Sequence, residues 1–365
     1  MKIRAAVLRQ TGLPHPYRQS KPLAIEELEL APPGRDEVLV RIRAAGLCHS
    51  DLSVINGDRP RPMALGHEAA GEVAALGDGV TDLQLGDHVA LVFVPSCGHC
   101  PPCCEGRPAL CEPGAQANGN GTLLSGARLL ESARGEAVNH HLGCSAFAEY
   151  AVVSRHSLVK IDPALPFDEA ALFGCAVLTG VGAVVNTAQV RAGQSVAVVG
   201  LGGVGPAAVI GALAAGAREV IAIDLAASKR ELATRLGATM SFDGGDPNCV
   251  AAVRDATNGG ADHVFEFAGS VRAFETAYCI TRRGGTTTTA GLPLVNLVAE
   301  ERTVKGSYIG SCVPVRDLPR YISLYRGGRL PVNLLLSHRL RLEDINEGFD
   351  RLHTGEAVRQ VVVFD

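Results

Sequence analysis

Hydrophobic and polar residues alternate along short segments in roughly the first 160 residues. Residues 37–43, for example, read Glu-Val-Leu-Val-Arg-Ile-Arg, and turns rich in glycine, proline and aspartate separate such segments. Alternation of this kind is typical of a strand that buries one face. We therefore predict that this part of the chain is mainly β-structure.

The pattern changes from about residue 177. A short apolar run typical of a buried strand covers 195–199, and a glycine-rich turn and an alanine-rich helix through Ala215 follow it. The pattern then predicts a strand at 220–223, a helix at 228–236 that stops at Gly237, and a further strand at 263–267. Repeated strand–helix units of this kind predict a parallel sheet.

Composition and charge narrow the class of protein. The 365 residues are enough for two domains, and 47% hydrophobic with 20% charged residues is ordinary for a chain that buries a large core. The net charge is -4 and no long basic run occurs, which argues against a nucleic-acid partner. No secretory signal is visible, and the apolar runs are well short of the roughly 20 residues that cross a bilayer. We expect a cytoplasmic protein without a membrane partner, in which eleven cysteines indicate metal binding more than disulfides.

Four of these cysteines lie close together in the loop 95–113, at Cys97, Cys100, Cys103 and Cys111. This spacing suits one tetrahedral zinc ion, and four thiolates leave no position for water, so the site would be structural. An iron–sulfur cluster also uses four cysteines, and chance clustering is the third alternative. We leave Cys104 out of the ligand set, although it could compete.

A second, open metal site is suggested by Cys48, His67 and Cys175. Taken singly, each is weak evidence, because a buried cysteine is usually a small hydrophobe and a histidine is more often structural. Together, three ligands of mixed sulfur and nitrogen type would leave the fourth zinc position for water or substrate, as a catalytic zinc requires.

A dinucleotide motif, Gly200-Leu-Gly202-Gly203-Val204-Gly205, lies between the predicted strand 195–199 and the following helix. Its glycines allow a tight turn, a close approach of the pyrophosphate, and close packing of helix and strand. Asp224 closes the next strand, where a carboxylate would bind the ribose hydroxyls and disfavour the extra phosphate of NADP. NAD is therefore the predicted cofactor. Lys229 could also reach the ribose, or Lys229 and Arg230 could be a solvated helix face.

Over nearly its whole length the chain resembles the zinc alcohol dehydrogenases of the long-loop type in the medium-chain dehydrogenase/reductase superfamily. The resemblance is carried by Gly-Leu-Cys-His-Ser-Asp at 46–51, Gly-His-Glu-Ala-Ala-Gly at 66–71, the four-cysteine loop, Phe-Gly-Cys at 173–175 and the glycine motif. It implies a GroES-like β-rich catalytic domain at 1–176 and 314–365, and a Rossmann NAD-binding domain at 177–313. The implied oligomer is a homodimer formed through the segment 303–310, with a tetramer as the alternative.

The resemblance also implies roles for individual residues. Cys48, His67 and Cys175 would bind the catalytic zinc, with Glu68 just behind it and Asp51 holding the ring of His67. Ser50 would take the alcohol proton, although a helix cap is its other interpretation. The histidine that ends this relay in some members is replaced by Ser53. The remaining implied contacts are His49 and Arg359 near cofactor phosphate, and Phe93, His141, Leu142 and Leu292 in the substrate pocket, with Leu292 also near the cofactor.

The function that follows is reversible, NAD-linked hydride transfer between a primary alcohol, medium-chain or aryl, and its aldehyde, with two zinc ions per chain. One alternative is glutathione-dependent formaldehyde dehydrogenase, but that branch carries an arginine for the glutathione carboxylate where this chain has Ala115. Another is a non-catalytic dinucleotide-binding protein of the same fold, which the retained zinc ligands oppose. These ligands also disfavour a zinc-free quinone reductase.

Overall fold

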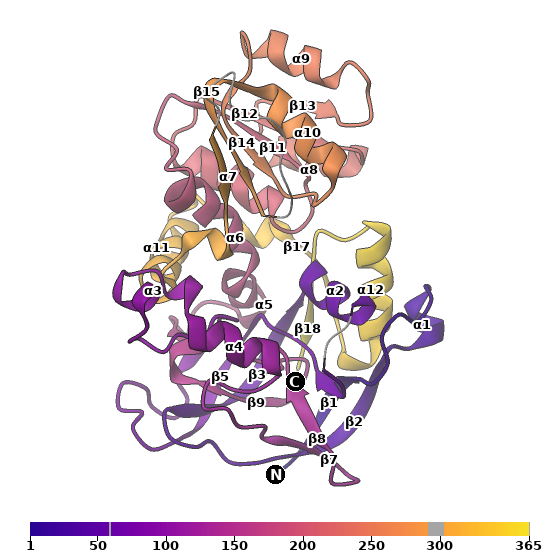
Figure 1. The fold of residues 1–365 in the computed structure, drawn as a ribbon, viewed down its shortest axis with the longest axis vertical. Helices are drawn as coiled ribbons and strands as arrows, with labels where there is room; N and C mark the ends of the chain where they lie inside the picture. Colours follow the sequence, from indigo (N-terminus) through magenta and orange to yellow (C-terminus); the bar gives the residue numbers. More distant parts are fainter. Residues whose placement is uncertain (58–59, 291–302, 365) are drawn as a thin grey trace. The chain divides into compact units, whose positions relative to one another are not determined.

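A computed structural model of the protein describes residues 1–57, 60–290 and 303–364, so the predicted pocket residue Leu292 lies outside the described residues. The chain forms two compact units, each of which draws on separate stretches of sequence (Figure 1). The first unit comprises Met1–Cys175, Val313–Pro319 and Leu336–Asp365, and the second comprises Ala176–Cys312 and Arg320–Leu335.

Residues 320–335 belong to the second unit, whereas the sequence analysis assigned them to the catalytic domain. The hydroxyl of Tyr321 accepts a hydrogen bond from Nδ2 of Asn186 at 3.4 Å. Ile322, Leu330 and Val332 are buried. The hydrogen bond and these buried apolar side chains attach the segment to the second unit.

The first unit contains a closed barrel and a sheet. The barrel has the strand order β1 (Lys2–Leu8), β2 (Leu23–Leu30), β7 (Leu130–Ser132), β8 (Ala137–His140) and β4 (Met63–Ala64). Alternate residues of β1, namely Ile3, Ala5 and Val7, are buried and pack in its core with Leu28 and Leu30 of β2. This is the packing that an alternating pattern predicts, because successive side chains of a strand point to opposite faces.

The sheet of the first unit has the order β10 (Leu158–Lys160), β6 (His88–Leu91), β5 (Ala69–Leu76), β3 (Glu37–Leu47), β18 (Arg359–Val363) and β17 (Leu336–Leu340), and β9 (Tyr150–Ser154) also pairs with β3. The predicted strand 37–43 is the first part of β3. Its neighbours β5 and β18 run antiparallel to it. The helices that accompany these strands are α1 (Tyr17–Ser20), α2 (His49–Asn56), α3 (Pro101–Cys104), α4 (Glu112–Asn120), α5 (Phe167–Ala170) and α12 (Ile345–Thr354).

The second unit is built on a parallel sheet with the order β13 (Met240–Asp243), β12 (Glu219–Asp224), β11 (Ser195–Val199), β14 (Ala261–Glu266), β15 (Thr281–Thr289) and β16 (Thr303–Gly306). Its helices are α6 (Ala176–Gly182), continued by the π-helix Ala183–Thr187, then α7 (Gly205–Ala214), α8 (Ala227–Arg235), α9 (Cys249–Ala256) and α10 (Val271–Ile280). Helix α11 (Pro314–Arg326) begins in a segment of the first unit and ends in one of the second.

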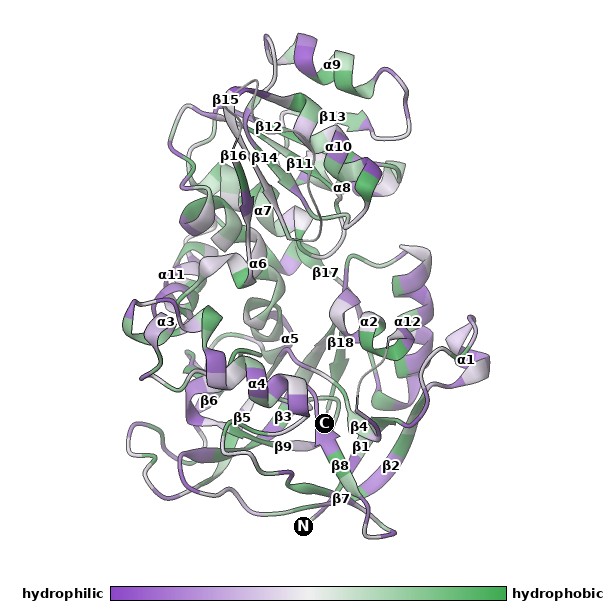
Figure 2. Cartoon of the chain, in the orientation of Figure 1, coloured by the Kyte–Doolittle hydropathy of each residue, from purple (hydrophilic) through white to green (hydrophobic). Residues whose placement is uncertain are grey.

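The strand order of this sheet reverses at β11, which pairs with β12 on one side and β14 on the other. In open α/β sheets, ligands bind beyond the carboxyl ends of the strands at such a reversal. Helix α7, which starts there, is buried from Gly205 to Ala212 and is drawn as hydrophobic in Figure 2.

Short 3-10 helices cover Pro108–Leu110, Arg155–Ser157, Ala171–Gly174, Ile309–Ser311, Val332–Leu335 and Leu342–Asp344.

Within the described ranges, no single helix is long and apolar enough to cross a membrane; one broken pair, Phe167–Gly174 with Ala176–Thr187, passes by length and composition alone.

Candidate functional site

The four loop cysteines converge. The sulfurs of Cys97, Cys100, Cys103 and Cys111 all lie within 4.8 Å of one another, and Cys100 Sγ is 3.9 Å from Cys111 Sγ. Four thiolates around one zinc at about 2.3 Å would be roughly 3.8 Å apart, so the spacing fits a single ion. An iron–sulfur cluster places several irons and sulfides between its thiolates and needs a wider set. The observed cluster therefore favours zinc.

Backbone amides also point at these sulfurs. Cys111 Sγ accepts hydrogen bonds from the N–H groups of Cys97 at 3.2 Å and Gly114 at 3.3 Å. Burial raises the pKa of Cys103 to about 12, whereas in Cys100 backbone donors at Cys103 and Glu112 outweigh burial and lower the pKa to about 7. Cys104, which the sequence analysis left out of the ligand set, is exposed and donates to the carbonyl oxygen of His99 at 3.5 Å.

A second cluster lies inside the first unit, where Cys48, His67, Glu68 and Cys175 bring one ligand atom each within 4.8 Å of one another. These residues come from three separate segments of the chain. Cys48 follows β3 and is the N-cap of α2, the pair at 67–68 immediately precedes β5, and Cys175 follows the 3-10 helix Ala171–Gly174. All four residues are buried.

His67 has the geometry of a metal ligand whose second ring nitrogen is held by a carboxylate. Its Nδ1 is 2.9 Å from Oδ1 of Asp51, and the other oxygen of Asp51 accepts the backbone N–H of Cys48 at 2.9 Å. Its Nε2 is buried and has no hydrogen-bond partner among the residues that the structure describes. A buried imidazole nitrogen without a partner is costly, and a bound zinc ion would satisfy it. The residues present therefore fit zinc.

Glu68 and Arg359 form a fully buried ion pair beside this cluster. Nη1 of Arg359, at the start of β18, donates to Oε1 of Glu68 at 2.8 Å and to the carbonyl oxygen of Leu47 at 3.2 Å. Burial raises the pKa of Glu68 to about 7, although the guanidinium opposes this shift. Sequence reasoning missed the pair, because nothing in the local sequence relates Arg359 to Glu68; the predicted contact of Arg359 with cofactor phosphate stays a prediction.

The remaining predicted residues of the first unit divide into two groups. The rings of Phe93 and His141 stand edge-on to the His67 ring, with centroids 5.4 and 5.5 Å away, and Leu142 follows with a left-handed φ of 51°. On α2, His49 and Ser50 are exposed, and Cys48 Sγ is 3.8 Å from Ser50 Oγ.

Ser53, also on α2, donates its hydroxyl to the carbonyl oxygen of His49 at 2.9 Å. The hydroxyl hydrogen of Ser53 is therefore donated inside the helix and is not free for a proton relay.

The glycine motif joins β11 to α7 in the second unit. Gly200 has a φ of 92°, and a Cβ there would lie 2.5 Å from the amide nitrogen of Ala268. A Cβ on Gly205 would lie 2.0 Å from the carbonyl oxygen of Gly200. Among the residues that the structure describes, Gly202 has no heavy atom within 4 Å of its Cβ position, so their packing does not require a glycine there. The open space is what a pyrophosphate needs in order to approach the backbone, and Gly203 and Val204 beside it are also partly exposed.

Asp224 ends β12 next to this loop. Its Oδ2 accepts the N–H of Leu201 at 2.7 Å, and its Oδ1 accepts that of Ala226 at 2.9 Å. The carboxylate is thereby attached to the glycine-rich loop, where the motif predicts a dinucleotide. Lys229 is half-buried on α8.

Comparison with known proteins identifies the family of the chain. Residues 34–163 match the family model described as "Alcohol dehydrogenase GroES-like domain", and residues 203–326 match "Zinc-binding dehydrogenase". "Putative alcohol dehydrogenase D" of Mycobacterium tuberculosis is 40% identical, with 100% of both chains covered. The chain belongs to the zinc-dependent alcohol dehydrogenases.

Two further similar proteins of this family differ in the substrate that their names state. "S-(hydroxymethyl)glutathione dehydrogenase" of Synechocystis is 38% identical over 99% of this chain and 100% of its own. The crystal structure of benzyl alcohol dehydrogenase from Acinetobacter calcoaceticus has a TM-score of 0.91, is 30% identical and covers 100% of both chains.

The predicted family, fold class and enzyme class are confirmed. This zinc-dependent alcohol dehydrogenase is an oxidoreductase with GroES-like and Rossmann-type domains, and its family uses zinc and an NAD-type cofactor on small-molecule alcohols.

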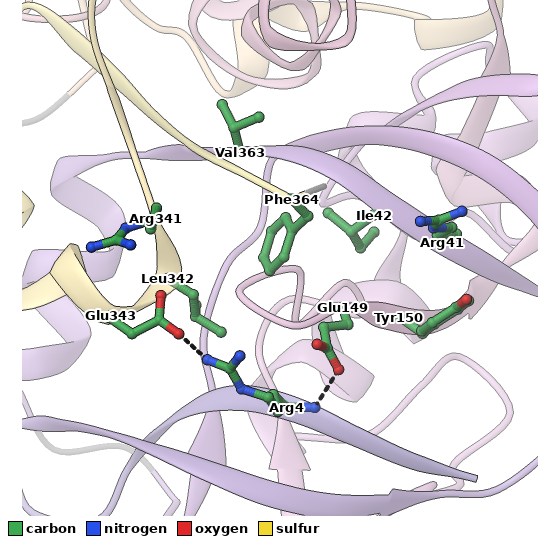
Figure 3. Close-up of a pocket in the computed structure, with 10 residues that line it drawn as sticks. All are labelled: Arg4, Arg41, Ile42, Glu149, Tyr150, Arg341, Leu342, Glu343, Val363 and Phe364. Atoms are coloured by element: carbon green, nitrogen blue, oxygen red, sulfur yellow. Dashed lines mark hydrogen bonds and ion pairs between the residues drawn. The ribbon is translucent and has the colours of Figure 1, made fainter.

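The first unit also holds a pocket of about 360 Å³ that includes no residue of the cysteine–histidine cluster. It is lined by Arg4, Arg41, Ile42, Glu149, Tyr150, Arg341, Leu342, Glu343, Val363 and Phe364 (Figure 3). Glu343 pairs with the Arg4 guanidinium, and Glu149 accepts the Arg4 backbone N–H. The residues that line this pocket include no histidine or cysteine that could bind a metal ion.

Proposed function

We propose that this dehydrogenase interconverts a hydrophobic primary alcohol, medium-chain or aryl, and its aldehyde, with NAD as the hydride carrier and two zinc ions per chain. The observation that carries the proposal is the buried convergence of Cys48, His67 and Cys175 around an imidazole nitrogen without a protein partner. When bound, zinc supplies a Lewis acid that lowers the pKa of an alcohol hydroxyl, and NAD accepts the hydride.

The protein's own groups would hold the reacting parts in place. Cys48, His67 and Cys175 are the catalytic zinc ligands, and Asp51 fixes the tautomer of His67 so that Nε2 keeps its lone pair. Glu68, balanced by Arg359, places a carboxylate behind the ligands. The four thiols at 97, 100, 103 and 111 hold the second, structural zinc.

Ser50 is the group that we assign to receive the alcohol proton, because its hydroxyl lies beside Cys48 at an exposed helix start. Since the Ser53 hydroxyl is already bonded to the His49 carbonyl, the proton would leave Ser50 for solvent or for the cofactor ribose and not through Ser53.

On the cofactor side, Asp224 supports NAD over NADP, because its carboxylate would face a 2′-phosphate with like charge. The backbone of 200–205 would hold the pyrophosphate. Lys229 at the ribose, and His49 and Arg359 at phosphate, are further proposed contacts.

An apolar alcohol is favoured by the proposed pocket of Phe93, His141, Leu142 and Leu292. Phe93 lies directly against the ring of His67, and the similar benzyl alcohol dehydrogenase supports an aryl substrate. The glutathione adduct of formaldehyde is the second candidate, favoured by the 38% identity to S-(hydroxymethyl)glutathione dehydrogenase. The exposed Ala115 offers no cation for a glutathione carboxylate.

The deciding assay follows the absorbance of NADH formed from NAD with ethanol, octanol and benzyl alcohol, and with formaldehyde plus glutathione. We expect turnover of benzyl alcohol or octanol that a zinc chelator abolishes, and two zinc ions per chain by elemental analysis. A Cys48→Ser variant should keep one zinc and lose turnover. Formation of NADH only with formaldehyde and glutathione would replace the proposed substrate, and no turnover with both zinc sites filled would favour a non-catalytic protein.

We also propose a cytoplasmic homodimer. All eleven cysteines are free, which suits a reducing compartment. Strand β16 is at the edge of its sheet and the segment 303–310 includes it, so a second copy could extend the sheet there. Light scattering at the mass of two chains would support the dimer, and four would indicate the tetramer.

A further inference from the structure

The guanidinium of Arg230, on α8, folds back over the turn that joins β12 to α8. Its Nη1 donates to the carbonyl oxygens of Asp224 at 2.7 Å and Leu225 at 2.8 Å. Its Nη2 lies 3.2 Å from Oδ2 of Asp243 on β13, and the Arg230 side chain is only 19% exposed. A solvated helix face, one of the two interpretations of Lys229 and Arg230 from the sequence, is therefore wrong for Arg230.

Helix α8 starts without the usual side-chain cap. Its N-cap residue is Ala226, which offers no side-chain acceptor, and the first turn of α8 contains no acidic residue. Asp224 takes over part of this task by accepting the N–H of Ala226. Arg230 has no acceptor and does not cap these N–H groups; it holds the turn by its carbonyl groups, with charge-assisted bonds to two of them that are stronger than neutral ones.

The position of this turn decides where the Asp224 carboxylate points. Each of its oxygens already accepts one backbone N–H, from Leu201 and Ala226 respectively. A carboxylate oxygen has a second lone pair, so the two oxygens together can still accept two hydroxyl hydrogens. Two adjacent ribose hydroxyls are the group that this remaining capacity fits.

We propose that Arg230 is a positioning residue for the adenosine end of the cofactor, which fixes the turn from β12 to α8 so that Asp224 accepts both ribose hydroxyls. The inference rests on the proposed NAD-linked function and adds a residue that acts through the backbone and through Asp224. Asp243 neutralises the guanidinium, so the same arginine does not attract a 2′-phosphate.

The test measures NADH affinity by fluorescence titration of the full-length protein with its zinc, for the wild type and for R230M, R230K and R235M. Arg235 is exposed on the same helix and provides the matched control. R230M should bind NADH roughly tenfold more weakly, with kcat at saturating NAD unchanged. R230K should recover part of the loss, because an ammonium still donates to one carbonyl, and R235M should match the wild type.

A double-mutant cycle asks whether the effect passes through Asp224. In a D224S background, adding R230M should cost less than about twofold in NADH affinity, because the carboxylate that Arg230 positions is already gone. D243N keeps both carbonyl bonds and removes the counter-charge, so its NADH affinity should fall by less than about threefold while NADPH affinity rises.

Equal NADH affinity for the wild type, R230M and R230K would overturn the role of Arg230 and leave the proposed function intact. A full tenfold loss added to D224S would also overturn it, since the arginine would then act independently of Asp224. Absence of NADH binding by the wild type would overturn the proposed function, and the inference with it.

Discussion

Acid should weaken the barrel of the first unit through one histidine, His140 at the end of β8. Its side chain is buried, and its Nε2 accepts the backbone N–H of Leu129 at 3.1 Å, so the folded protein needs the neutral ring. Burial, aided by the charge of Arg128, lowers the pKa of His140 from 6.5 to about 4. The unfolded chain therefore binds this proton more readily than the folded one.

The direction and the magnitude of the change in the free energy of unfolding with pH follow from this difference in pKa. The contribution of His140 to the free energy of unfolding is fully present above about pH 6.5 and is lost as the pH falls towards 4. At pH 5 the loss amounts to roughly 2 kcal/mol, since each pKa unit corresponds to about 1.4 kcal/mol. His140→Gln cannot take up this proton, so its stability should depend less on pH by the same roughly 2 kcal/mol between pH 7 and pH 5.

The measurement is urea unfolding followed by circular dichroism at both pH values, together with hydrogen exchange of the Leu129 amide, which reports on the barrel directly. His338→Gln, at an exposed histidine, is the control and should keep the wild-type pH dependence. An H140Q protein that loses as much stability as the wild type between pH 7 and pH 5 would refute the reasoning.

Three further predictions concern the two proposed zinc sites and the dinucleotide loop. Cys103→Ser should lose the structural zinc and lower the unfolding temperature, whereas Cys104→Ser should keep two zinc ions by elemental analysis; equal zinc contents would contradict the ligand assignment. Asp51→Ala should weaken zinc binding at His67 by about 10- to 100-fold in chelator competition, because the ring loses its orienting acceptor, and unchanged competition would count against this role. Gly202→Ala should leave the unfolding temperature unchanged and weaken NADH binding at least tenfold, because its Cβ would meet none of the described residues and would enter the space proposed for the pyrophosphate; unaltered NADH titration would place the pyrophosphate elsewhere.

Local patterns were sufficient for the glycine motif of the second unit and for the strands and helices around it. The predicted strand 195–199 has the same bounds as β11, and the predicted helix 228–236 differs from α8 by one residue at each end. Both predictions depend on short-range periodicity and on the glycine residues that end each element, and both signals can be read from a single sequence.

Partners brought together by tertiary structure could not be obtained in that way. Glu68 and Arg359 are 291 positions apart, and neither carries a local signal of the other. Arg230 has the spacing of a solvated helix residue, and only the neighbouring strand β13 supplies its acidic partner. The place of residues 320–335 in the second unit likewise rests on tertiary contacts, such as the hydrogen bond from Asn186 to Tyr321, which periodicity does not reveal.

Strand β18 has a consequence for the order in which this protein can be made. It pairs with both β3 and β17 and carries Arg359, yet the contact from Arg359 to Leu47 spans 312 positions. The ribosome must synthesise the whole second unit before β18 is available. Until then, β3 has an open edge and Glu68 has no buried cation. The first unit is therefore completed last, and a nascent protein gains the buried pair of Glu68 and Arg359 only after the second unit has emerged.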